Sequence, residues 1–426
     1  MLDAASFDRT YAYEYDGNGN ITKITYGGQS IRYTYDSQNQ LIREDNQAAG
    51  KTWVWIYDGA GNITGKSEHP YTTGTPAITY GTKNYSYGQG YTWGDLLTSY
   101  GSKTITYDAI GNPLSDGTWT YTWSQGRQLS RMSSGSSFWN FTYDADGMRT
   151  GRSNTGTVYT YTYNGSQLVR MNSTSANMRF TYGADGAPLT ISYGGTIYYY
   201  VTNLQGDVVA ILNSSGVMVV EYTYDAWGRL LSTTGSMANT LGLHNPLRYR
   251  GYVYDRETGL YYLQSRYYNP EWGRFINADG LVSTVQGLIG YNMFAYCGNN
   301  PVNRIDYTGR FWSEIWEFAK TAVTEIGKAM GLMSPAYAGC GGLAVADGAL
   351  PFTDMVAVAG AALLTVAAIG YGIYQAAQAP ATSFSKAEEK IEAIVIPMKP
   401  DNPVVFPVDP DTFNPVELVK VPRVGT

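Results

Sequence analysis

The chain has 426 residues, of which 43% are hydrophobic and 15% charged, and its formal net charge is -6. The acidic balance excludes the clustered basic face that a nucleic-acid-binding protein needs. Two cysteines exclude a disulfide framework, and no phosphate-binding or metal-ligand motif is present, so we predict neither a cofactor nor a metal. The 39 tyrosines and 49 glycines favour strands and turns. We therefore predict a mainly β protein.

Tyrosine divides the chain into unequal parts, because 36 of the 39 tyrosines lie in residues 1–310. Proline marks a second boundary, since 8 of the 17 prolines fall between Pro380 and Pro422. We predict a β-rich head over residues 1–310, a short α-helical and apolar segment over 311–380, and an extended Pro-rich linker over 381–426.

A pattern of Tyr-Asp followed three residues later by Gly recurs through the head, which indicates a repeat architecture. In a weaker copy, Tyr35-Asp36, the glycine position holds Asn39. Asn is the commonest residue besides glycine to accept a left-handed backbone, so this position is predicted to be the left-handed residue of a turn. The full copies begin at Tyr15, Tyr57, Tyr107, Tyr143 and Tyr224.

Large and small residues alternate before each Tyr-Asp pair, as in Ile31-Arg32-Tyr33-Thr34-Tyr35. A period of two predicts a strand with its aromatic rings on one face. The aspartate ends the strand, the glycine reverses the chain, and residues such as Ile21 and Ile63 start the return strand. Each repeat is therefore predicted to be one β-hairpin, with about eleven hairpins paired edge to edge into one long sheet.

These repeats resemble the YD repeats of RHS-type proteins, Tc-toxin C components and teneurins. The resemblance is most specific over residues 245–310, which contain YDRETGLYYL, RYYNPEWGRF and CGNNPVN in that order. This stretch is similar to the RHS repeat-associated core domain. The resemblance implies a spiralling antiparallel sheet that forms a hollow shell, closed at one end by the core domain. It divides the head into a YD-repeat shell, residues 1–243, and the core domain, residues 244–310, here named the closing segment.

In proteins of this kind the shell encloses a C-terminal effector, usually a toxin. The resemblance therefore implies a delivery and encapsulation scaffold of a bacterial polymorphic toxin, with an enclosed or lost effector as partner and an immunity protein as a further one. The tail contains no histidine and no paired catalytic motif. We therefore expect a C-terminal piece of a longer toxin that lacks its effector.

The resemblance also implies an aspartyl autoprotease that cuts the chain in cis. Matched by motif, Asp279 in GRFINAD and Asp306 in NRIDYTG are the catalytic carboxylates, and Arg266 in SRYYNP is the assisting cation. Two buried carboxylates cannot both ionise readily, so one acts as an acid while the other activates water. The predicted cut lies between Arg310 and Phe311. Two residues depart from the family pattern, because Tyr307 replaces a typical proline and Arg310 a typical leucine.

Two alternatives remain open at this point. Asp279 and Asp306 could be turn residues that cap strands, with Arg266 paired to one of them for structure alone. The whole head could instead belong to a secreted or cell-surface adhesin that binds carbohydrate by stacking sugars on its tyrosines. A scaffold predicts rings that face a cavity and one another, whereas an adhesin predicts a cluster of exposed rings.

The tail carries the predictions on membranes and location. FWSEIWEFAKTAVTEIGKAM has apolar residues at helical spacing, and residues 355–374 form an uncharged run long enough to cross a bilayer. A helix packed inside the shell explains the same run equally well. We expect a secreted or cell-envelope protein, with a single transmembrane helix at 355–374 as one possibility for membrane contact.

Overall fold

The computed structural model describes residues 10–174, 176–183, 186–280, 288–310 and 313–314. These residues belong to one compact unit, Met1–Phe318. Among them, no helix has the length and apolar character needed to span a bilayer. Most of the predicted helical segment, the predicted span at 355–374 and the Pro-rich linker lie outside the described residues.

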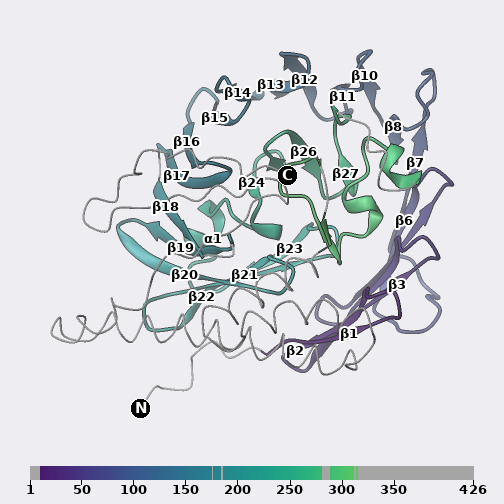
Figure 1. The fold of residues 1–426 in the computed structure, drawn as a ribbon, viewed down its shortest axis with the longest axis horizontal. Coiled ribbons are helices and arrows are strands. Elements are labelled where there is room, and N and C mark those ends of the chain that lie inside the picture. Colours follow the sequence, from purple (N-terminus) through teal and green to yellow (C-terminus); the bar gives the residue numbers. More distant parts are fainter. Residues whose placement is uncertain (1–9, 175, 184–185, 281–287, 311–312, 315–426) are drawn as a thin grey trace, which may run out of the picture. The chain divides into compact units, whose positions relative to one another are not determined.

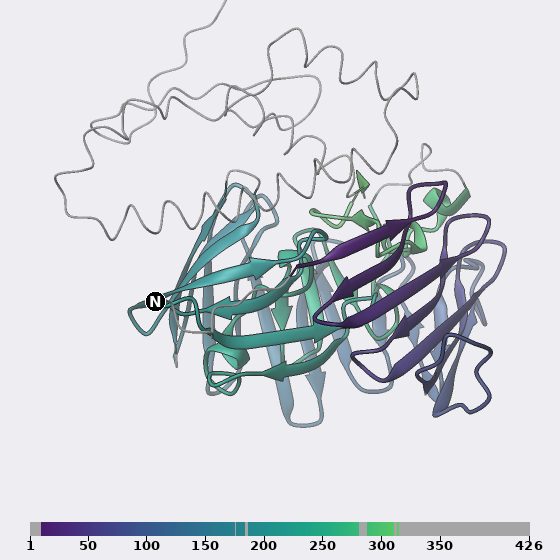
Figure 2. The same ribbon diagram turned by 90° about the horizontal axis from the view of Figure 1, so that it is seen from below.

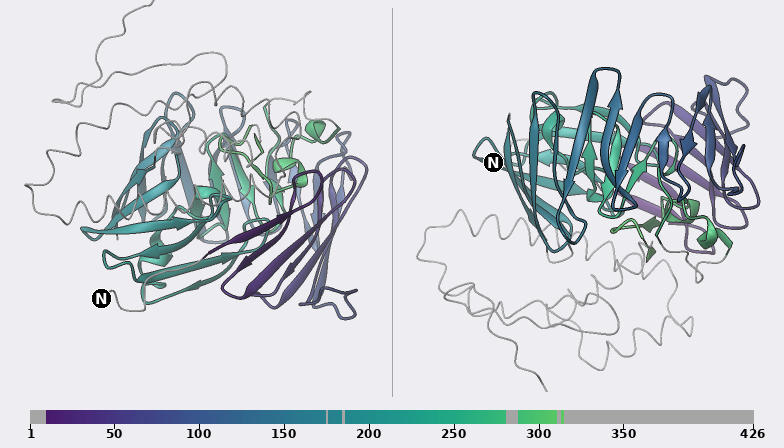
Figure 3. Two further views of the ribbon diagram at one scale, coloured as in Figure 1. Left: turned by 60° about the horizontal axis from the view of Figure 1, so that its bottom comes forward. Right: turned by 90° about the horizontal axis from the view of Figure 1, so that it is seen from above.

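Antiparallel strands connected in chain order build a wall over Ala12–Thr234, in two sheets. Figure 1 shows these strands following one another around the short strands of the closing segment, and Figures 2 and 3 show the same arrangement from other sides. The first sheet contains β1 (Ala12–Tyr15), β2 (Ile21–Tyr26), β3 (Gln29–Tyr35), β4 (Leu41–Asn46), β5 (Lys51–Tyr57), β6 (Ile63–Pro70), β7 (Gly81–Tyr87), β8 (Leu97–Tyr100) and β9 (Lys103–Thr104). The second contains β10 (Thr106–Tyr107), β11 (Pro113–Ser115), β12 (Thr120–Ser124), β13 (Gln128–Ser134), β14 (Ser137–Tyr143), β15 (Arg149–Ser153), β16 (Val158–Asn164), β17 (Gln167–Ser173), β18 (Asn177–Tyr182), β19 (Pro188–Tyr193), β20 (Thr196–Thr202), β21 (Val208–Leu212), β22 (Met218–Tyr224) and β23 (Leu230–Thr234).

The prediction of one continuous sheet is wrong at a single point, because the ladder is interrupted at Ile105. Strand β9 pairs with β8, whereas β10, one residue later, pairs with β11. Between them the Ile105 side chain is buried, and its N–H donates to the carbonyl of Thr98 at 2.9 Å. Ile105 thus still bonds β8, whereas Thr106 and Tyr107 pair with β11, so one extended segment serves both sheets.

The repeated turn has the predicted geometry. In the turn between β1 and β2, Asp16 Oδ1 accepts the N–H groups of Asn18 at 2.9 Å and Asn20 at 2.8 Å. Gly19 has φ 83° and donates its N–H to the Asp16 carbonyl at 3.1 Å. Asn39 has φ 60°, which confirms that it occupies the left-handed glycine position of its repeat.

In six repeats, the tyrosine that ends a wall strand joins its hairpin to the preceding one. Tyr35 Oη donates to the Ile21 carbonyl at 2.7 Å, and Tyr57 Oη donates to the Leu41 carbonyl at 2.6 Å. The same bond recurs from Tyr87 to Ile63, from Tyr143 to Leu129, from Tyr182 to Leu168 and from Tyr224 to Val208. Neighbouring hairpins are therefore joined by side chains as well as by the strand ladder.

Alternating burial confirms that one face of the wall is aromatic and apolar. In β3, Ile31 and Tyr33 are buried whereas Arg32 and Thr34 are exposed. The buried rings of the wall and of the closing segment belong to one hydrophobic cluster. The hydrophobic effect therefore holds the closing segment against the wall.

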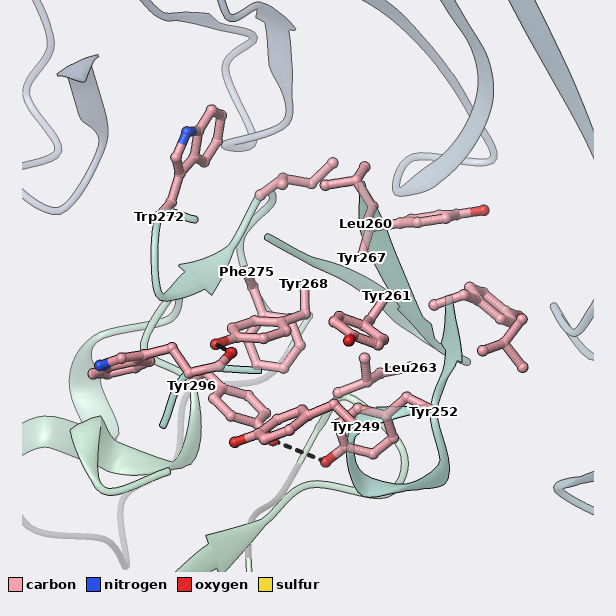
Figure 4. Packing of buried hydrophobic residues seen from close by; sticks show 14 of the residues in the cluster. Tyr249, Tyr252, Leu260, Tyr261, Leu263, Tyr267, Tyr268, Trp272, Phe275 and Tyr296 are labelled. Carbon is pink, nitrogen blue, oxygen red and sulfur yellow. Dashed lines mark hydrogen bonds between the residues drawn. The ribbon is translucent and has the colours of Figure 1, made fainter. Parts of the chain in front are cut away.

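The closing segment is rich in buried tyrosines and has little regular structure. Its elements are α1 (Leu241–His244, which begins just before it), β24 (Val253–Asp255), β25 (Leu260–Leu263), β26 (Arg266–Asn269), β27 (Arg274–Phe275), β28 (Arg304–Ile305), and the 3₁₀ turns Tyr249–Gly251, Leu288–Tyr291 and Cys297–Asn299. Strands β24–β27 form a four-stranded antiparallel sheet. Figure 4 shows the rings packed around it, with Tyr268 and Tyr296 only 4.1 Å apart between ring centroids.

The last Tyr-Asp turn of the wall, Asp225–Gly228, is buried beneath these rings. Its successive carbonyls accept three hydroxyl groups: Ala226 from Tyr249 at 2.9 Å, Trp227 from Tyr268 at 2.7 Å and Gly228 from Tyr261 at 2.9 Å. A buried backbone carbonyl without a partner is costly, so these hydroxyls make burial of the turn possible.

The CGNNPVN loop and Asn292 bind the first three turns of the wall through amides. The residue after the left-handed turn position, Asn20, Gln40 or Asn62, bonds its own aspartate and also accepts an amide from the closing segment. These second bonds are Asn300 Nδ2 to Asn20 Oδ1 at 2.9 Å, Asn299 Nδ2 to Gln40 Oε1 at 2.8 Å and Asn292 Nδ2 to Asn62 Oδ1 at 2.8 Å. One side chain therefore serves both the hairpin and its contact with the closing segment.

The predicted helix from residue 311 differs from the structure at its first described residues. Ser313–Glu314 form strand β29, which pairs antiparallel with β28 through Ile305–Ser313 and Arg304–Glu314. The backbone groups of these two residues are used by β28, so the helical spacing of the apolar residues does not decide their conformation.

Candidate active site around Asp306

Asp306 follows directly after β28 and holds the backbone that leads to the predicted cleavage point. Its Oδ1 accepts the N–H groups of Thr308 at 3.2 Å, Gly309 at 2.8 Å and Arg310 at 3.1 Å. Its own N–H donates to the Tyr252 hydroxyl at 3.0 Å. The carboxylate thus fixes the main chain up to the residue before the predicted cut.

Gly309 lies so close to the start of β26 that no side chain fits there. Its φ is 73°, and an added Cβ would lie 2.6 Å from the Leu263 carbonyl oxygen and 2.8 Å from Ser265 Oγ. Ser265 Oγ donates to the Thr308 carbonyl at 2.7 Å, and Arg266 Nε donates to the Gly309 carbonyl. Hydrogen bonds from Ser265 and Arg266 therefore hold the turn after Asp306 against the start of β26.

Arg266 links the two predicted carboxylates. Its Nη2 lies 2.9 Å from Asp279 Oδ2 and 3.7 Å from Asp306 Oδ2. Its Nη1 donates to the Met293 carbonyl at 2.8 Å, and its guanidinium carbon lies 3.5 Å from the centroid of the Phe275 ring. The structure thus brings together all three residues that were predicted from motifs, which are up to 40 positions apart in sequence. We name them the carboxylate site.

Burial controls the protonation of this site. Asp306 is 2% exposed, and burial raises its pKa from 3.8 to about 6, against the opposing effects of Arg266 and the three backbone N–H groups. Burial lowers the pKa of the Arg266 guanidinium, and the carboxylates of Asp279 and Asp306 oppose this effect. Below about pH 6, a protonated Asp306 beside an Asp279 that is ion-paired with Arg266 is the arrangement that acid–base chemistry with two carboxylates requires.

The predicted cleavage residues lie at the edge of the described chain. Arg310 is exposed, and Phe311 lies outside the described residues. Strand β29 pairs with β28, so the peptide bond between Arg310 and Phe311 belongs to the segment that connects these two strands. An exposed residue in such a connection is accessible to water.

The hairpin wall and its closing segment correspond to a known family. The teneurin YD-shell family model matches residues 27–302. The chain belongs to the teneurin YD-shell family.

Relatives of this YD-shell chain are much longer proteins. It is 35% identical to a tRNA3(Ser)-specific nuclease WapA of Bacillus spizizenii and 31% identical to the tRNA nuclease WapA of Bacillus subtilis, in each case over 73% of this chain and 15% of the relative. Among solved structures, the Photorhabdus luminescens Tc holotoxin pore has a TM-score of 0.54 and 21% identity, over 71% of this chain and 17% of that one. The last similarity shows a shared fold.

Sequence reasoning missed the residues that hold the YD-shell site in place. Tyr252 and Ser265 bind the two ends of the Asp306 turn, and Gly309 permits its close approach. The only sequence signal for Ser265 and Gly309 is their position. Ser265 precedes the predicted Arg266, and Gly309 precedes the predicted cleavage residue Arg310. Tyr252 gives none, because it is one of many tyrosines and only the fold places its hydroxyl at Asp306.

Proposed function

We propose that this YD-shell chain is an encapsulation and delivery scaffold for a C-terminal effector, and that it cuts itself between Arg310 and Phe311. The observation that carries the self-cleavage is that one carboxylate, Asp306, binds the N–H of Arg310 while sharing Arg266 with Asp279. The named activities of the WapA nucleases are not transferred, since this chain spans only 15% of their length.

The reaction we propose is hydrolysis of one peptide bond by two carboxylates. Asp279, the closer partner of Arg266, takes a proton from water, and the water oxygen attacks the carbonyl carbon of Arg310. Asp306, which is protonated below its raised pKa of about 6, donates its proton to the leaving nitrogen of residue 311. The C–N bond breaks, which leaves a carboxyl group on Arg310 and an amine on the following residue.

The scaffold proposal is supported by the direction of the aromatic rings. In the part of the chain that the structure describes, the exposed aromatic side chains are Tyr80, Tyr291 and Tyr307, which come from separate segments. The rings of the repeats are packed against one another and against the closing segment. A carbohydrate-binding adhesin needs a cluster of accessible rings, so no observation favours that alternative.

Intact-mass measurement of the purified full chain tests the self-cleavage. We expect two fragments that meet between Arg310 and Phe311 in the wild type, and an uncut chain in D306N and D279N. The matched control is D16N, because Asp16 also accepts backbone N–H groups in a turn but lies outside the carboxylate site. An intact wild-type chain, or cleavage that persists in D306N, would contradict the proposal and leave the three residues with a structural role.

The pH dependence of the cut sharpens this test. Because the pKa of Asp306 is raised to about 6, the proton that it donates is present below this pH and is lost above it. We expect the cleavage rate to fall as the pH rises from 6 to 8, by about tenfold for each pH unit well above the pKa. A rate that does not change over this range would exclude Asp306 as the acid.

We further propose that the protein is secreted or associated with the cell envelope, as its resemblance to RHS toxins implies. Immunoblots of culture medium, envelope and cytosol from the native host test this, and a purely cytosolic signal would contradict it. The immunity protein, carbohydrate binding and membrane contact through residues 355–374 stay predictions.

A further inference from the structure

The segment that carries Asp279 is held by the wall as well as by the closing segment. The N–H of Ala278 donates to the Gly111 carbonyl at 3.2 Å, and the Ala278 carbonyl accepts Arg127 Nη1 at 3.0 Å. Gly111 lies in the turn between β10 and β11, and Arg127 in the turn between β12 and β13. Both polar groups of the residue before Asp279 therefore bind neighbouring wall hairpins.

Packing makes this contact close. Gly111 has φ 82°, and a Cβ added there would lie 3.0 Å from the Ala278 Cβ and 2.8 Å from the Trp93 ring. Ala278 is fully buried. The position of Asp279 therefore depends on how the wall turn fits against the preceding residue.

Charge adds a second link between the wall and the carboxylate site. Asp279 and Asp108 are the carboxylates that stabilise the charge of Arg127, whose pKa is lowered by partial burial. The Arg127 charge in turn acts on Arg266. Asp306 differs, because Tyr252, Gly309 and the other partners named above for its turn all belong to the closing segment.

We propose that Arg127 is a positioning residue supplied by the wall, which sets Asp279 against Asp306 once hairpins β10–β13 have docked on the closing segment. It acts through the Ala278 peptide and through its charge, without contacting the bond that is cut. Cleavage therefore requires an assembled shell wall, because the closing segment alone positions only one of the two carboxylates. This inference rests on the proposed self-cleavage.

The first test compares R127Q with R131Q. Arg131 lies on the same hairpin, but its Nη1 bonds Asn140 Oδ1 of the next wall strand at 2.8 Å, away from the carboxylate site. Cleavage is followed by intact mass over time between pH 5 and 8, with the thermal transition measured alongside. We expect R127Q to cut about tenfold more slowly or worse at every pH of this range, since small displacements of reacting groups are costly. R131Q should keep the wild-type rate, and R127K should recover part of the rate.

A second pair of variants tests the same contact without changing a charge. In G111A the new methyl group pushes on Ala278, whereas in G147A, with φ 84°, the nearest atom is the side-chain Nε2 of Gln128 at 3.3 Å. The two variants carry the same backbone strain, so only G111A should slow the cut by about tenfold. This pair decides the matter if R127Q does not fold.

The outcomes separate this inference from the proposed function. If the wild type remains intact, self-cleavage and its positioning residue both fail. If the wild type is cut and R127Q is cut at the same rate between pH 5 and 8, only the role of Arg127 is overturned. Equal rates in G111A and G147A would likewise overturn it.

Discussion

The wall and the closing segment are stabilised at different ranges along the chain. In the wall, Asp16 bonds the N–H of a residue four positions away, and Tyr35 bonds the preceding hairpin. In the closing segment, Asn300 bonds Asn20, 280 positions away, and Asp255 binds Arg149, 106 positions away. The wall is therefore a series of local units, whereas the closing segment also depends on contacts with distant parts of the chain.

This difference predicts that the largest loss of stability comes from breaking a long-range ion pair. Asp255 is 1% exposed, and it accepts Arg149 Nη2 at 3.0 Å and lies 3.5 Å from Arg152 Nε. D255N leaves two buried cations without their shared anion, so we expect the free energy of unfolding to fall by about 3–5 kcal/mol. Chemical denaturation measures this, with the exposed site of D146N as control. A loss below about 1 kcal/mol would show that the pair contributes little.

Two glycines with the same backbone angle separate the contribution of the closing segment from that of the turn. Gly19 and Gly228 both have φ 83°, but a Cβ meets nothing within 4 Å at Gly19 and lies 2.5 Å from the Tyr249 ring at Gly228. We expect G19A to cost about 1 kcal/mol through the backbone alone, and G228A to cost about 2–4 kcal/mol through added overpacking. Equal losses in denaturation experiments would mean that the Tyr249 ring moves aside freely.

The pH dependence of the free energy of unfolding tests a contact between the two long sheets of the wall, the one made by Glu44. Glu44 on β4 accepts the Ala226 N–H at 2.7 Å, and burial together with the Asp225 carboxylate raises the pKa of Glu44 from 4.5 to about 8. The folded chain therefore keeps a proton that the unfolded chain releases. The stabilisation is complete below pH 4.5 and is lost as the pH rises through about 8.

We expect the free energy of unfolding to fall by roughly 1–2 kcal/mol between pH 6 and pH 8 in the wild type. E44Q cannot ionise and should show a flatter profile over this range. E14Q, at a largely exposed carboxylate, should retain the wild-type profile. Identical slopes in the wild type and E44Q would assign the pH dependence to other groups.

The smallest predicted effect concerns the amide contacts with the first turns. N300A removes the bond to Asn20 Oδ1, which is 2.9 Å long and buried, so we expect a loss of about 1 kcal/mol. N18A removes an exposed amide bond on the same turn and should change stability by less than about 0.5 kcal/mol. Thermal denaturation compares the two variants. An equal loss of stability would mean that the buried bond from the closing segment stabilises this turn no more than the exposed bond does.

Much of the wall could be predicted because its contacts are local and repeated. Alternation fixed which residues of β3 are buried, and Asn39 in a glycine position revealed the left-handed turn residue. The break at Ile105 could not be predicted, since nothing nearby marks the point at which the chain changes from one strand partner to another. Ser313–Glu314 were expected in a helix for the same reason, because their strand partner lies outside the local pattern.

Only the residues of the candidate site that lie in recognisable motifs could be predicted from the sequence. Asp279, Asp306 and Arg266 were found by resemblance, and the fold brings them together. Arg127 escaped notice because it belongs to a wall turn more than 130 residues earlier in the chain, and its role depends on an approach that only packing creates.

The sequence by itself determined the hairpins of this chain, because strand alternation and turn chemistry act between residues a few positions apart. Tertiary structure decided which turns are buried and which tyrosine hydroxyls reach which carbonyls. It also decided that burial raises the pKa of Asp306 towards neutrality, even though Arg266 lies beside it. Burial and the pKa of a carboxyl group depend on atoms brought together from distant parts of the chain, and no local pattern specifies them.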